Sequence, residues 1–168
     1  MNPASEYVES SRDISPLHRY VSDEGEGVSK QNIEHVTIAG RRVALADEVT
    51  SEERTLIKEA IRATAPSEKA CFVNALKMWE YDDRFAYAEG FTVMSDLDID
   101  RIEHAWCMLD GEKLVDGTEA FDYYHGAIIT DPEVLERYTG SDLCANGIIG
   151  NRTDRYEFLR KRGYVDHR

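Results

Sequence analysis

Three consecutive segments decide the fold: FAYAEGFTVM (residues 85–94), IEHAWCML (102–109) and KLVD (113–116). The first alternates along its length, and all three are rich in apolar, aromatic or β-branched residues, as is typical of β-strands. Asp110-Gly111 separates the last two segments and predicts a hairpin turn. Gly90, inside the first segment, indicates a bulge or a close approach of two backbones. The sequence therefore predicts an antiparallel sheet across this region.

Helical spacing precedes the predicted sheet. ACFVNALKMW (70–79) carries its apolar residues at helical intervals, so Cys71 stands at the start of a predicted helix. An earlier helix is predicted over 51–64, where a capping box precedes an apolar face. The other predicted elements are a hairpin over 35–45 that turns at Ala39-Gly40 and two helices within 131–140 and 154–163. Helices followed by an antiparallel sheet predict an α+β class.

The chain of 168 residues is long enough for one sizeable core and too short for two typical domains. Residues 1–31 are polar and end in the charged, glycine-containing SDEGEGVSKQ. They are predicted to be a flexible or loosely docked N-terminal extension, because Tyr7, Leu17 and Tyr20 offer little surface to bury. Residues 32–168 are predicted to form a single α+β domain.

Charge and composition narrow the class of protein. The chain has 20 Lys and Arg against 33 Asp and Glu, a formal net charge of −13, which opposes binding to nucleic acid or anionic membranes. No apolar run approaches the ~18 residues that span a bilayer, and the N-terminus lacks the apolar region of a secretory signal. Three cysteines without a CxxC spacing do not favour a disulfide framework or a zinc site. We therefore expect a cytoplasmic protein.

Cys71, His104 and Asp116 together suggest nucleophilic chemistry. A helix N-terminus favours a thiolate, because its unpaired N–H groups and its dipole stabilise negative charge. An imidazole can take the thiol proton, and a carboxylate can hold that imidazole in one tautomer and orientation. Each residue alone also has a common structural explanation: a buried thiol, a satisfied strand histidine and a turn aspartate. Their occurrence in this order favours a catalytic set.

The hairpin register decides whether the imidazole meets the carboxylate. If the turn contains only two residues, Leu109 pairs with Glu112, and His104 faces Gly117, one step from Asp116. A one-residue bulge would bring His104 and Asp116 level on one face. The sequence leaves this register open.

The order of Cys71, EHAW (103–106) and VDGT (115–118) resembles the transglutaminase-like branch of the papain-like cysteine protease superfamily. In that branch a helix-borne Cys is followed by His-Ala-Trp and then by Asp-x-Thr. YAEGF (87–91) is also similar to the strand that precedes the His in bacterial and phage members. The resemblance covers roughly residues 67–120. It implies a papain-like core, in which a helix bearing the Cys packs on an antiparallel sheet bearing the His and the Asp.

Two positions depart from the family's usual pattern. Gly117 stands where the family usually has Pro, and Ala70 stands where it usually has an aromatic residue or Gly. These departures leave the nucleophile and the base in place, and they bear on the type of substrate.

Further residues are expected to line the substrate site: Asn74, Glu89, Gly90, Glu103 and Trp106. Cys107 and Cys144 are expected to be core residues, Cys107 because it lies on the opposite strand face from His104. A metal site drawn from His104, His125, Asp116 and Glu103 is a weaker alternative, because their spacing repeats no known ligand pattern. No metal and no cofactor is therefore expected.

The resemblance implies a thiol-dependent enzyme that acts on acyl or amide bonds with a Cys-His-Asp triad. Peptidase, amidase, deamidase and transglutaminase-like acyl transfer all remain open, with a protein, a peptide or a small amide as substrate. The alternative is a catalytically silent papain-like fold that serves as a protein-binding or inhibitor module. The sequence does not indicate the oligomeric state.

Overall fold

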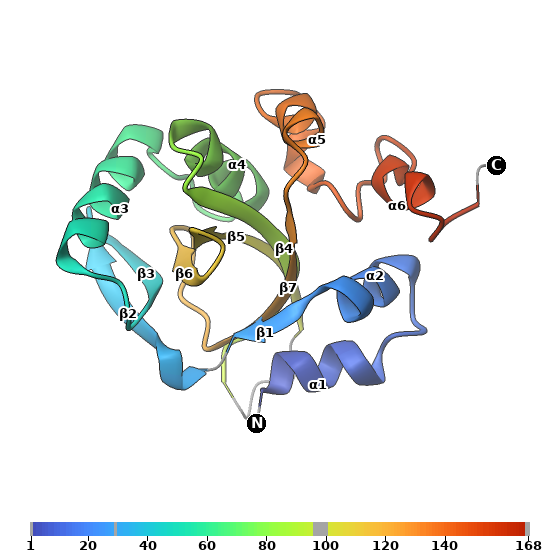
Figure 1. Ribbon diagram of the computed structural model, residues 1–168, viewed down its shortest axis with the longest axis horizontal. Coiled ribbons are helices and arrows are strands. Elements are labelled where there is room, and N and C mark those ends of the chain that lie inside the picture. The colour runs from blue at the N-terminus through green and yellow to red at the C-terminus, as the bar shows by residue number, and fades with distance from the viewer. Residues whose placement is uncertain (1, 29, 96–100, 167–168) are drawn as a thin grey trace.

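The computed structural model describes residues 2–28, 30–95 and 101–166. A curled, seven-stranded antiparallel sheet forms the centre of the described chain, with strand order β1-β7-β4-β5-β6-β3-β2 (Figure 1). The strands are β1 Glu26–Val28, β2 Ile33–Ile38, β3 Arg41–Ala46, β4 Phe85–Val93, β5 Ile102–Leu109, β6 Lys113–Asp116 and β7 Tyr123–Ile129. The helices in the described residues are α1 Pro3–Ser10, α2 Pro16–Glu24, α3 Ser51–Thr64, α4 Cys71–Tyr81, α5 Pro132–Tyr138 and α6 Glu157–Lys161. The predicted α+β class is confirmed.

β4 lies between β5 and β7 at the middle of the sheet. Gly90 pairs with His104 on one side and with Gly126 on the other. A Cβ at Gly90 would lie 2.1 Å from the carbonyl oxygen of His125, so the neighbouring strand leaves no room for a side chain. Pairing is continuous along β4, so this glycine marks a close approach of two backbones and not a bulge.

The hairpin between β5 and β6 has three loop residues in place of the expected two. Leu109 pairs with Lys113, so Asp110, Gly111 and Glu112 form the turn. Asp110 and Gly111 both have positive φ, at 54° and 74°, and Glu112 is the additional residue before pairing begins. The pairing is therefore shifted by one residue from that of a two-residue turn.

This register puts the imidazole and the carboxylate on one face without a bulge. Met108 pairs with Leu114, and side chains alternate along a strand, so His104 and Asp116 project from the same side of the sheet. Beyond the last β5–β6 pair, Asp116 pairs with Ala44 of β3. The pairing of β5 with β6 therefore ends before it reaches His104.

The helix α4 covers the other face of β4 and β5. Tyr87 pairs with Cys107 and Glu89 pairs with Ala105, so these side chains project toward α4. The Cys107 thiol donates a hydrogen bond to the carbonyl of Ala75 in α4 over 3.4 Å. Figure 1 shows α3 beside α4, on the side of the sheet away from α1 and α2.

The described residues of the N-terminal segment 1–31 pack against the sheet. β1 pairs with β7 at the edge of the sheet, and α1 and α2 pack against β7. Ala4, Val8 and Val21 are completely buried in these contacts. All three have small or β-branched side chains on short helices, so the apolar pattern of this segment is weak. Residues 1 and 29 of this segment lie outside the described residues.

No helix in the described ranges is both long enough and apolar enough to cross a membrane.

Candidate active site

Cys71 is the first residue of α4 and is partly buried. Ala70 forms the N-cap, and no side chain accepts a hydrogen bond from the first turn of the helix. Lys69, immediately before it, has a positive φ of 60°, a backbone conformation that is uncommon for a residue with a side chain. The thiol therefore stands at an uncapped helix N-terminus after a sharp turn in the backbone.

His104 is held on several sides. Its side chain is buried, and its Nε2 lies 2.7 Å from Oδ2 of Asp116. The edge of Phe121 meets the ring at a centroid distance of 4.9 Å, and the ring of Trp106 is stacked at 6.2 Å. The imidazole therefore has little freedom to rotate.

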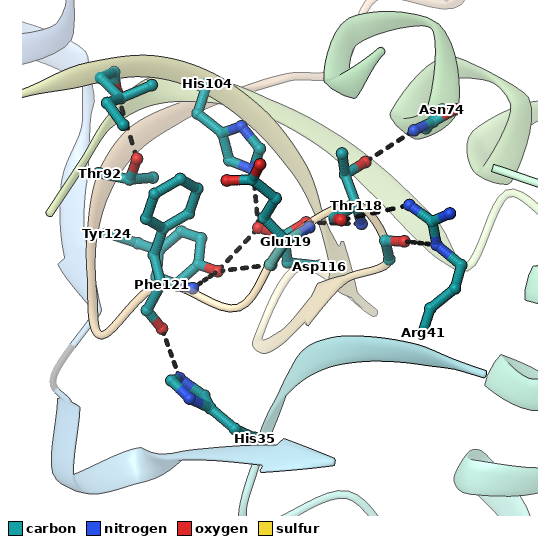
Figure 2. A network of polar contacts seen from close by, with 12 residues as sticks. His35, Arg41, Asn74, Thr92, His104, Asp116, Thr118, Glu119, Phe121 and Tyr124 are labelled. Carbon is teal, nitrogen blue, oxygen red and sulfur yellow. Dashed lines mark hydrogen bonds and ion pairs between the residues drawn. The ribbon is translucent and has the colours of Figure 1, made fainter. Parts of the chain in front are cut away.

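Asp116 is completely buried and accepts four hydrogen bonds. Oδ1 accepts from the backbone N–H groups of Thr118 (3.0 Å) and Glu119 (3.2 Å). Oδ2 accepts from the His104 ring and from the hydroxyl of Tyr124, each over 2.7 Å. Figure 2 shows these side chains gathered beneath the His104 ring. These four donors hold the carboxylate in one orientation beside the imidazole.

The surroundings of His104 stabilise its protonated form. Burial by itself lowers the pKa of His104, but the Asp116 carboxylate and then the Cys71 thiol, as a hydrogen-bond partner and as a charge, raise that pKa to about 10. Because Asp116 engages Nε2, the ring nitrogen that remains for the thiol is Nδ1. Of the three residues singled out in the sequence, Asp116 therefore bonds the His104 ring directly, and Cys71 acts on the pKa of that ring.

Asn74 fastens the start of α4 to the turn after Asp116. Its Nδ2 donates to Oγ1 of Thr118 over 2.9 Å, and its amide exchanges hydrogen bonds with the backbone of Ser67 at 2.8 and 3.1 Å. Its side chain is buried. Asn74 therefore holds the helix and the loop before it in place, and its amide is engaged in these internal bonds.

Arg41 adds a second connection between the same two loops. From β3 its guanidinium donates to the carbonyls of Gly117 and Thr118 over 3.3 Å each (Figure 2). It also donates to the carbonyl of Pro66 over 3.0 Å. Pro66 precedes the Cys71 helix, and Gly117 follows Asp116. The distance between nucleophile and carboxylate is therefore fixed by side-chain contacts from two different elements.

The other residues expected at the substrate site lie in different environments. Trp106 is buried beside His104, and its ring lies 2.5 Å from where a Cβ of Gly126 would be. Gly90 is buried between strands. Glu103 is exposed at the start of β5. Glu89 is buried on the α4 side, opposite His104, and is a structural anchor inside the protein in place of a cleft residue.

The remaining cysteines and His125 lie apart from this arrangement. Cys107 is buried, and burial raises its pKa far above that of a free thiol. Cys144 is also buried. His125 projects toward α1, where its Nδ1 lies 2.8 Å from the hydroxyl of Ser5. Among the described residues, no three His, Cys, Asp or Glu side chains are grouped as the ligands of a metal ion.

Sequence reasoning missed Tyr124 and Arg41, which both act on the Asp116 turn. Tyr124 lies in β7, whose YYHGAII run is buried on both faces and does not alternate. Arg41 belongs to the predicted hairpin, but its contacts are all to backbone carbonyls distant in sequence. No local motif marks such long-range partners.

No protein-family model matches the chain, and comparisons with curated proteins and with solved structures gave no match. The arrangement of the side chains is therefore the basis for a functional assignment.

Proposed function

We propose that the protein is a thiol-dependent enzyme acting on acyl or amide bonds, with a papain-like core of the transglutaminase-like type. One observation carries the proposal: the buried ring of His104 holds Asp116 on Nε2 over 2.7 Å, and the thiol of Cys71, at an uncapped helix start, contributes to the raised pKa of that imidazole. The chain order Cys, His, Asp and the α+β class with a curled antiparallel sheet support the same core.

In the proposed reaction Cys71 is the nucleophile. Its proton passes to Nδ1 of His104, and the sulfur attacks the carbonyl carbon of the substrate. The C–N or C–O bond then breaks, the leaving group takes the proton from His104, and a thioester remains on Cys71. Water or an amine attacks this thioester, giving up a proton to His104 and releasing the thiol. Hydrolysis results in the first case and acyl transfer in the second.

The charges at the site suit these steps. An imidazole whose pKa is raised to about 10 holds its proton at neutral pH, which favours a thiolate–imidazolium pair and supplies a proton for the leaving group. The backbone N–H groups of the first turn of α4 have no side-chain cap, so they can donate to the oxyanion that forms at the carbonyl oxygen.

The test compares alkylation and turnover in matched variants. Iodoacetamide labelling of Cys71 is followed from pH 4 to 9 in the wild type and in His104→Ala, and hydrolysis or aminolysis of activated esters, peptides and small amides is followed in parallel. We expect Cys71 to react readily near pH 6 in the wild type and much more slowly in His104→Ala. Cys71→Ala is expected to abolish turnover, while Cys144→Ala serves as the control that retains it.

The outcomes separate the two functions considered from the sequence. An alkylation profile that is unchanged in His104→Ala would show that thiol and imidazole are not coupled, which contradicts the enzyme proposal. A coupled thiol without turnover on all three substrate classes would instead favour the silent binding module.

A further inference from the structure

The carboxylate oxygen that holds His104 is shared with a second side chain. Oδ2 of Asp116 accepts from Nε2 of His104 and from the phenol of Tyr124, each over 2.7 Å. The two donors come from different strands, His104 from β5 and Tyr124 from β7, and they meet on the same face of the sheet (Figure 2). Neither of the two backbone donors to Asp116 uses this oxygen.

The direction of the Tyr124 hydroxyl is fixed by its own partners. The residue is completely buried, and its ring meets Trp106 edge-on at a centroid distance of 5.0 Å. The backbone N–H of Phe121 donates to the phenol oxygen over 3.1 Å. Of the two acceptors that the O–H can reach, Oδ2 of Asp116 at 2.7 Å is much closer than the carbonyl of Glu119 at 3.4 Å, so the O–H points at the carboxylate. Burial and the charge of Asp116 raise the pKa of Tyr124 well above 10, so this hydroxyl keeps its proton and remains a donor.

We propose that Tyr124 is a positioning residue of the thiol site, which occupies the shared oxygen of Asp116 and so limits how tightly that carboxylate holds the His104 proton. This inference rests on the proposed function. A hydrogen bond to a carboxylate spreads its negative charge over the donor, so the attraction left for the imidazolium is weaker. A proton held less tightly is more easily given to a leaving group.

Other ionisable groups also face this set and enter the expectation. Cys71, at the start of α4, contributes to the raised pKa of His104. Burial and then the charge of Asp116 raise the pKa of Cys107, which lies on the opposite face of β5. Asp122 acts on Tyr124 from the loop before β7. From β2, His35 bonds the carbonyl of Phe121 over 2.8 Å. None of these groups is changed when the phenol hydroxyl alone is removed.

The test is Tyr124→Phe, with the pKa of His104 read by NMR of the imidazole between pH 6 and 11. Without the phenol, Asp116 attracts the imidazolium more strongly, so we expect the midpoint to move upward by about half a pH unit or more. His104 is an imidazolium at acid pH in both the wild type and Tyr124→Phe. The acid side of the Cys71 alkylation profile is therefore expected to be the same in both proteins. Because the proton is released less readily, kcat is expected to fall while KM changes little.

Tyr138→Phe is the matched control. The Tyr138 hydroxyl also bonds a carboxylate, that of Asp154, but on α5 away from the site. Both variants lose a buried phenol hydrogen bond and are expected to lose stability, whereas only Tyr124→Phe is expected to move the His104 midpoint. A midpoint that is unchanged or lowered in folded Tyr124→Phe would overturn the inference. A midpoint that rises in a protein without turnover would support this role of Tyr124 and count against the enzyme proposal alone.

Discussion

Two buried carboxylates lie on opposite faces of the same sheet, Asp116 beside His104 and Glu89 toward α4. Each accepts a hydrogen bond from a tyrosine and from two backbone N–H groups. Asp116 also has an imidazole as partner, whereas no Lys, Arg or His in the described chain forms an ion pair with Glu89. The difference between the two sites is therefore one cation.

That cation determines where the proton resides. At the first site it sits on His104, whose pKa is raised to about 10 by Asp116 after burial has been overcome. At the second site burial raises the pKa of Glu89 to about 8, because its hydrogen bonds only partly compensate for lost solvation. Glu89 accepts hydrogen bonds from the N–H groups of Ile148 and Ile149 and so holds the loop that contains these two residues on β4. A buried carboxylate by itself does not indicate catalysis.

Removing the charge at each site should give the largest contrast. Asp116→Asn takes away the anion that stabilises the imidazolium, and we expect turnover to fall by about 100-fold or more. Glu89→Gln keeps the shape on the opposite face and is expected to leave turnover within about threefold. Steady-state rates on the best substrate from the panel provide the measurement, with circular dichroism spectra to verify folding.

Equal losses in both variants would break the comparison. They would mean that Glu89, although on the other face, acts on the reaction through the loop that it holds. His104→Ala is the reference for complete loss, and Asp116→Asn is expected to retain more activity than it, because orienting the base contributes less than being the base.

The second contrast is in stability as a function of pH. The folded-state pKa of Glu89 is raised from 4.5 to about 8, so between these values the folded protein binds more protons than the unfolded chain, and stability falls as pH rises. The slope for one such group is at most about 1.4 kcal/mol per pH unit. Glu89→Gln should remove this slope, which urea denaturation at pH 5, 6, 7 and 8 would measure.

His104 should contribute in a different pH window. Its folded-state pKa is raised from 6.5 to about 10, so its stabilising effect is complete below 6.5 and is lost as pH rises toward 10. His104→Ala should therefore flatten the curve between pH 7 and 10 and leave the slope between pH 4.5 and 6.5 unchanged. If Glu89→Gln flattened the upper window and left the lower one steep, the assignment of the two windows to Glu89 and His104 would be wrong.

Local patterns in the sequence predicted the elements that have strong periodicity. β4, β5 and β6, the helix beginning at Cys71 and the hairpin turning at Ala39-Gly40 all follow from alternation, helical spacing or turn residues. β7 was missed, since a strand between two others can be apolar on both faces and loses its alternation. β1 was missed because three residues with one apolar side chain carry almost no pattern.

The site shows the same limit. Cys71, His104 and Asp116 could be found from their types and order, but the register that joins them depends on one extra turn residue, Glu112. Glu89 was expected to line the cleft, with an exposed strand carboxylate as the more common alternative. Its burial depends on backbone donors nearly sixty residues later in the chain, a contact that no local signal encodes.

The smallest expected effect concerns two thiols with different exposure, the partly buried Cys71 at the start of α4 and the buried Cys107 of β5. Cys107 lies three residues after His104 on β5, so it projects toward Glu89 and α4, while the imidazole projects toward Asp116. It is buried, and its raised pKa keeps it protonated, so iodoacetamide near pH 6 should label Cys71 and leave Cys107 unmodified. Peptide mass mapping after brief labelling checks this directly. Cys107→Ala should leave turnover unchanged, with a loss of about 1 kcal/mol in unfolding free energy from the missing thiol contacts. Labelling of Cys107 at a rate comparable to Cys71 in the folded protein would mean that the α4 face opens in solution, and the two faces of the sheet would then not be the separate environments described above.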